Sequence, residues 1–156
     1  MTVRRLAVLL ALALAVVSGC GVGGDDTPGP RKVVDERGLR TDLAPLTKRF
    51  PRIGEPESAQ WQSGTLGDAR TAPGPSTHWI DGVVELAPQM ASRLRLDAGP
   101  PAGALPDLAP DVADLVPGGR LAPVGGIGQG DGYEGWTSQA WLVEGTDTLV
   151  ISALDD

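Results

Sequence analysis

His78 is the residue best suited to chemistry near neutral pH, because it is the single histidine of the chain. Ser63, Ser76 and Asp81 lie near it in sequence or across an expected strand pairing. A Ser–His–Asp catalytic set would need these groups in one constellation. Side chains alternate between the two faces of a strand, so His78 and Asp81 should point apart. We therefore expect a structural or ligand-contacting histidine and no catalytic residues.

The aromatic residues are dominated by tryptophan, with four Trp beside one Phe and one Tyr. Tryptophan offers a large apolar surface and an N–H donor, which suits core packing and also the binding of a glycan, peptide or protein. The sequence leaves both roles open. The candidate ligand contacts that we select are Trp61, Trp79, His78 and Tyr133.

Gly130–Gly135 has the spacing G-x-G-x-x-G, which in dinucleotide-binding folds follows a strand and opens a helix. Here a glycine-rich loop precedes the motif and an expected strand follows it. One His and one Cys leave only carboxylates as further zinc ligands, and the aspartates between Asp107 and Asp131 lack the spacing of an EF-hand loop. We expect no cofactor and no metal.

The first twenty residues contain a membrane-targeting signal. Arg4 and Arg5 precede an apolar run, Leu6–Val17, which is too short for the ~20 residues of a membrane-spanning helix. The following Val17-Ser18-Gly19-Cys20 resembles the lipobox of bacterial lipoproteins. This resemblance implies cleavage before Cys20 and a diacylglyceryl group, with palmitate-type acyl chains, on the Cys20 thiol. It predicts a lipid anchor on the extracytoplasmic face of the cell membrane.

The charge balance argues against nucleic acid as a partner. Removal of residues 1–19 takes away two of 13 basic residues and leaves 11 against 20 acidic ones, a net charge of −9. Such a surface repels nucleic acid and anionic head groups. We expect a monomer that reaches the membrane through the lipid on Cys20 and binds a protein or cell-wall partner.

Composition divides the chain into three parts. Residues 1–19 are the predicted lipoprotein signal peptide. Residues 20–38 are the lipidated cysteine and a tether, because Gly, Pro and mixed charges dominate without apolar periodicity. Residues 39–156 are the expected extracytoplasmic domain, about one domain in length.

Several short elements are expected within that domain. Helical spacing of apolar residues predicts helices over 39–50 and 88–96, with a further helical turn in 111–116. Two strands, 57–65 and 77–86, should pair antiparallel, and Gly82 indicates a bulge or a close backbone approach. The segment 97–132 is rich in Gly and Pro and should be the least structured.

The strongest hairpin signal lies at 135–143 and 148–154, two apolar runs joined by Glu144-Gly145-Thr146-Asp147. The expected register places Leu142 opposite Leu149, Trp141 opposite Val150 and Ala140 opposite Ile151. Apolar residues occupy both faces of this hairpin, so it should be central in the sheet. The predicted fold is a loop-rich α+β domain, a twisted antiparallel sheet of four or five strands with one or two short helices.

The stretches WQSGTLG and PGPSTHWIDGVVEL resemble small uncharacterised lipoproteins of high-GC Gram-positive bacteria, a resemblance that carries no function. The leading hypothesis is a non-enzymatic, membrane-anchored binding or interaction domain. The alternatives are a small envelope hydrolase or enzyme accessory protein, and a structural subunit of an envelope complex. A pocket holding His78 and a carboxylate would favour the hydrolase, whereas a flat apolar patch around tryptophan would favour the other two.

Overall fold

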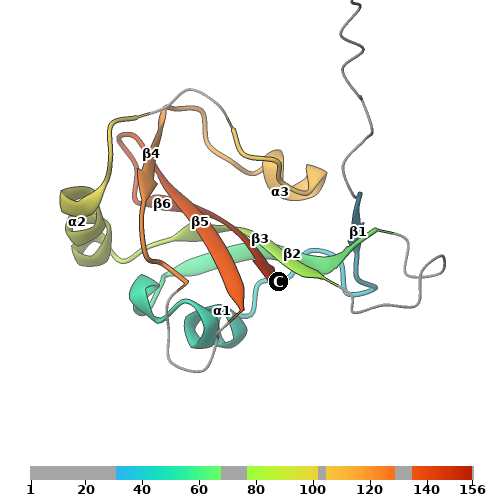
Figure 1. The fold of residues 1–156 in the computed structure, drawn as a ribbon. Helices are drawn as coiled ribbons and strands as arrows, with labels where there is room; N and C mark the ends of the chain where they lie inside the picture. Colours follow the sequence, from blue (N-terminus) through green and yellow to red (C-terminus); the bar gives the residue numbers. More distant parts are fainter. Residues whose placement is uncertain (1–30, 68–76, 102–104, 129–134, 156) are drawn as a thin grey trace, which may run out of the picture.

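The computed structural model describes residues 31–67, 77–101, 105–128 and 135–155. These residues form one antiparallel sheet of six strands in the order β1-β2-β3-β6-β5-β4. Helices α1 and α2 lie on one side of the sheet and α3 on the other (Figure 1). The strands are β1 (Lys32–Val34), β2 (Ser58–Leu66), β3 (His78–Glu85), β4 (Leu121–Val124), β5 (Trp136–Val143) and β6 (Thr148–Asp155). The helices are α1 (Ala44–Arg49), the 3-10 helix η1 (Pro51–Ile53), α2 (Pro88–Asp97) and α3 (Pro110–Ala113).

The architecture is the small α+β sheet that the sequence predicted, but its strand count exceeds the expected four or five. The two additional strands, β1 and β4, form the edges of the sheet. Strand β4 lies inside 97–132, where glycine and proline predicted little structure. Its Pro123 is tolerated because an edge strand needs hydrogen bonds on one side only.

Strand β1 lies inside the segment 20–38, which was predicted to be a tether. It pairs antiparallel with β2, with Val33 opposite Thr65. The tether prediction is therefore wrong for residues 32–34. Three residues are too few to show a periodicity, and they become a strand because β2 supplies the hydrogen-bonding partners.

The β5–β6 hairpin has the predicted register, with Ala140 opposite Ile151 and Leu142 opposite Leu149. Strand β6 is central and pairs with β3 on its other side, as the apolar character of both its faces indicated. The β2–β3 pairing is likewise antiparallel and runs through Gly82 without a shift in register. A Cβ at Gly82 would lie 3.0 Å from the Cβ of Trp61, so this glycine permits a close approach and does not form a bulge.

Helix α1 begins five residues later than predicted. The preceding Arg40 forms a bridge with Trp61, in which each backbone N–H donates to the other residue's carbonyl, so this segment is extended along β2. The helix ends before Pro51, because a proline disfavours the helical conformation of the residue that precedes it. Helix α2 has nearly its predicted bounds, and α3 lies at the predicted helical turn.

Two hydrophobic clusters cover the two faces of the sheet. Trp61, Ile80 and Ile151 face the larger cluster, which includes Leu46 of α1 and Leu94 of α2. The second cluster, beneath α3, contains these buried residues: Trp79, Val83, Leu108, Ala109, Val112, Leu121, Val143 and Val150. Burial on both faces explains why β3 and β6 carry apolar side chains on both of their faces.

Candidate functional site

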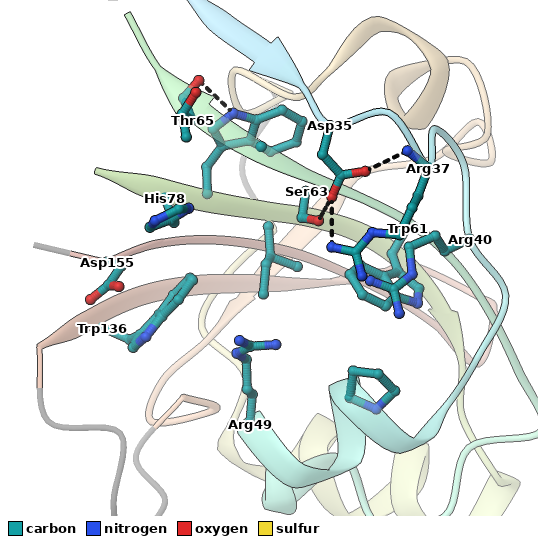
Figure 2. Close-up of a pocket in the computed structure, with 14 residues that line it drawn as sticks. Asp35, Arg37, Arg40, Arg49, Trp61, Ser63, Thr65, His78, Trp136 and Asp155 are labelled. Atoms are coloured by element: carbon teal, nitrogen blue, oxygen red, sulfur yellow. Dashed lines mark hydrogen bonds and ion pairs between the residues drawn. The ribbon is translucent and has the colours of Figure 1, made fainter. Parts of the chain in front are cut away.

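A cleft of about 530 Å³ lies at one end of the sheet, on the face that α1 covers. Figure 2 shows its side chains converging from the sheet, from α1 and from the segment that follows β1. We call it the arginine cleft. It is lined by Asp35, Arg37, Arg40, Pro45, Arg49, Trp61, Ser63, Gly64, Thr65, His78, Trp79, Ile80, Trp136 and Asp155.

Strand register builds one wall of the arginine cleft. Thr65 of β2 lies opposite His78 of β3, which lies opposite Asp155 of β6, which lies opposite Trp136 of β5. Directly opposed residues share a face and have Cβ atoms about 4.5–5.5 Å apart. His78 is exposed and Asp155 is half-buried, and the two side chains are neighbours without a hydrogen bond or ion pair between them.

Asp35 is held by three donors on the opposite side of the cleft. The Arg37 backbone N–H and Nη2 donate to its carboxylate over 2.9 and 3.0 Å, and Ser63 Oγ donates over 2.6 Å. Partial burial raises the pKa of Asp35, but the hydrogen bonds from Ser63 and Arg37 and the charge of Arg37 outweigh it and lower the pKa below its usual value.

Arg40 covers the ring of Trp61, with its Cζ 3.8 Å from the ring centroid. Its Nε donates to Asp42 over 2.9 Å, and hydrogen bonding from Arg40 lowers the pKa of the Asp42 carboxyl. The Trp61 indole N–H donates to the Asp42 carbonyl over 3.0 Å. Arg40 is thus neutralised by Asp42, as Arg37 is by Asp35.

Arg49 differs from these two arginines. It extends from α1 toward the sheet, and its Cζ lies 5.3 Å from the centroid of the Trp136 ring (Figure 2). Its Nε is buried and has no hydrogen-bond partner. Within the described ranges, no ion pair reaches its guanidinium either. Among the residues that the structure describes, no carboxylate therefore neutralises the charge that Arg49 brings to the arginine cleft.

The four predicted ligand contacts have different positions. His78 lies at the cleft, whereas Tyr133 is outside the described residues, as is the predicted lipid-attachment residue Cys20. Trp61 and Trp79 border the cleft but are only 1% and 0% exposed. Their rings belong to the two hydrophobic clusters, which corrects their selection as exposed binding residues.

Among the residues that the structure describes, the candidate catalytic set is not assembled. Asp81 lies on the face opposite His78, as strand alternation predicted, and its carboxylate accepts hydrogen bonds from Lys32, Ser152 and the Ala109 backbone. The Ser63 hydroxyl donates to Asp35. Ser76 lies outside the described residues.

Sequence reasoning missed Asp155, Arg49 and Asp35, and it did not select Trp136. For Trp136 and Asp155 a signal was present, because extending the predicted hairpin register places them opposite each other. For Arg49 the sequence contained no such signal, because its approach to Trp136 depends on how α1 packs across the sheet.

In the described ranges, no three His, Cys, Asp or Glu side chains are grouped so as to hold a metal ion. None of the helices described here is long and apolar enough to cross a membrane. Comparison with known proteins gave no match to any family model, to any curated protein or to any solved structure.

Proposed function

We propose that this chain is a lipid-anchored extracytoplasmic domain that binds a ligand or partner in the arginine cleft. The anchor rests on the signal sequence and on Cys20 of the lipobox. The observation that carries the binding function is the cleft itself. Its volume of about 530 Å³ is within the range of ~300–1,000 Å³ that is typical of ligand sites.

The composition of the cleft supports binding. Trp136 supplies a half-buried aromatic surface, and Arg49, His78 and Asp155 supply polar groups that the protein leaves without hydrogen bonds in the described structure. A few such polar groups in a partly apolar concavity fix the orientation of a ligand. By contrast, Asp35, Ser63 and Arg37 bind one another and stiffen the cleft wall.

The test is photo-crosslinking of the full-length lipidated protein in its membrane. A photoreactive amino acid replaces the exposed His78, and in a matched control it replaces Ser92, which is exposed on α2 and does not line the cleft. We expect a defined light-dependent adduct from position 78 and none from position 92. No adduct at 78, or the same adducts at both positions, would refute binding in the cleft.

A small hydrolase is the second candidate, because the cleft does hold His78 beside a carboxylate, that of Asp155. A pocket that holds His78 and a carboxylate is the feature that favours a hydrolase. A base must form a hydrogen bond with the hydroxyl that it activates. For Ser63 to act as the nucleophile, its hydroxyl would therefore have to break its hydrogen bond to Asp35 and form one to His78. The binding domain needs no such rearrangement, so it remains the leading proposal.

A further inference from the structure

We infer that the ligand of the arginine cleft carries an oxyanion, a carboxylate or a phosphate, and that Arg49 binds it. This inference rests on the proposed binding function and identifies the chemistry of its ligand.

The charges that line the cleft point to Arg49. Arg37 and Arg40 each form an ion pair with an aspartate next to them in sequence, at 3.0 Å for Arg37. Asp35 is also occupied, because it accepts hydrogen bonds from Ser63 and Arg37. Arg49 is the cleft arginine for which the described residues provide no carboxylate or carbonyl acceptor. An anion that enters the cleft would therefore meet the guanidinium of Arg49, and it would have to bind away from the Asp155 carboxylate on the cleft wall.

The surroundings of Arg49 hold its guanidinium in place before a ligand binds. The side chain is half-buried, and its Cζ is 5.3 Å from the centroid of the Trp136 ring. Contact with an aromatic face restricts the rotation of a guanidinium and leaves its edge open to acceptors. Such a planar fork matches the two oxygens of a carboxylate or phosphate, and pre-organisation lowers the entropy lost on binding.

The buried Nε of Arg49 is the second observation. A buried donor without an acceptor is unfavourable, and proteins rarely retain one. Arg37, Arg40, Arg52 and Arg95 each have a carboxylate partner, whereas the half-buried Arg49 has none among the described residues. An oxyanion ligand in the cleft would give the Arg49 guanidinium the acidic partner that the described residues do not provide.

Isothermal titration calorimetry of the full-length protein in detergent tests this inference. The probes are inorganic phosphate, N-acetyl-alanyl-alanine with a free carboxylate, the same peptide as its C-terminal amide, and sodium chloride at matched ionic strength. We expect saturable binding of phosphate or of the free peptide at millimolar concentration or below, and none of the amide or chloride. The two positive arms distinguish a phosphate ligand from a carboxylate ligand.

Arg49→Gln should weaken that binding by about tenfold or more, because a charged hydrogen-bond donor is lost. The matched control is Arg93→Gln on α2, an exposed arginine that pairs with no carboxylate of the described residues and does not line the cleft, and it should bind like the wild type. Thermal melting should leave Arg49→Gln close to the wild type, since the guanidinium makes no hydrogen bond or ion pair with the described residues and only its contact with the Trp136 ring is lost. If Arg49→Gln does not fold, Arg49→Lys replaces it and should still bind several-fold more weakly, because an ammonium lacks the fork.

Failure to bind either oxyanion probe, or equal binding by wild type and folded Arg49 variants, would overturn the inference. The proposed function is judged separately by the adduct at position 78. An adduct at 78 without oxyanion binding refutes the oxyanion ligand alone. Absence of that adduct refutes the binding function on which the inference rests.

Discussion

The ammonium of Lys32 lies 2.7 Å from the carboxylate of Asp81 and joins the edge strand β1 to the centre of the sheet. Asp81 is fully buried and the Lys32 side chain is 13% exposed. The same Nζ contacts the Asp107 carbonyl and lies 5.5 Å from the centroid of the Trp79 ring. Ser152 Oγ and the Ala109 N–H also donate to Asp81, over 2.8 and 2.7 Å. The pair thus holds β1, β3, β6 and the segment before α3 together.

Lys32→Met should destabilise the domain by ~3–5 kcal/mol, because it leaves the buried Asp81 carboxylate without its counter-charge. Chemical denaturation measures this loss. The double variant Lys32→Met with Asp81→Asn should recover part of the stability, since the uncompensated charge is then gone. A Lys32→Met variant as stable as the wild type would show that the ion pair makes no net contribution to stability.

A chain that starts at Leu39 lacks β1 and Lys32, so it too leaves Asp81 without its counter-charge. It should melt at a lower temperature than a chain that includes β1.

Gly64→Ala should displace β1 from the sheet. A Cβ at Gly64 would lie 1.8 Å from the Val33 carbonyl oxygen and 2.9 Å from the Trp79 ring, distances that force neighbouring atoms apart. We expect a loss of about 1–3 kcal/mol and faster amide hydrogen exchange in β1. Gly118→Ala is the control, because a Cβ there meets nothing within 4 Å. Equal exchange in the two variants would contradict the close packing of β1 on Gly64.

Asp35→Asn should cost about 1–3 kcal/mol at pH 7, because hydrogen bonds to a charged acceptor are lost. Although burial raises the pKa of Asp35, the hydrogen bonds from Ser63 and Arg37 outweigh it and lower the pKa in the folded protein below its ordinary value of 3.8. Its stabilising effect is therefore complete above the unfolded pKa and declines as the pH falls through the folded one. The difference in melting temperature between wild type and variant should be constant near neutrality and shrink below about pH 4. A difference that grows on acidification would contradict this direction of the pKa shift.

Cys20→Ser should leave an uncleaved precursor that carries no lipid, because the thiol is the predicted acyl acceptor in Val17-Ser18-Gly19-Cys20. Intact mass and metabolic lipid labelling of the membrane fraction measure this. Stable anchoring needs more than one acyl chain, so the processed wild type should carry at least two. Normal cleavage and lipid labelling of the variant would refute the lipoprotein prediction.

If the cleft is a binding site, any hydrolytic activity of the protein should persist in the His78→Ala variant. His78 is exposed and has no hydrogen bond to Ser63 or Asp155 within the described structure. The purified protein is screened against ester, peptide and glycan substrates, and any activity found is repeated with the variant. Loss of a catalytic histidine typically lowers the rate by at least ~10²-fold. A drop of that size, with the melting temperature unchanged, would replace the binding proposal by the hydrolase alternative.

The sequence alone determined the interior strands and α2. The register of the β5–β6 hairpin was readable because only one alignment of its short turn pairs the apolar residues of both strands. The antiparallel pairing of β2 with β3 followed from two β-rich runs joined by a loop. The same alternation placed His78 and Asp81 on opposite faces. These features depend on neighbours close in sequence, and local patterns encode them directly.

Only the tertiary structure decided the edges of the sheet and the arginine cleft. Strand β1 is three residues long, and β4 contains Pro123, so neither has a local signal that outweighs its glycine- and proline-rich surroundings. Arg49 and Trp136 come from a helix and a distant strand, and α1 brings them together only by packing Leu46 and Phe50 against the sheet. That no described carboxylate pairs with Arg49 could not be read from the sequence for the same reason, because ion pairing depends on the whole arrangement and on no single segment.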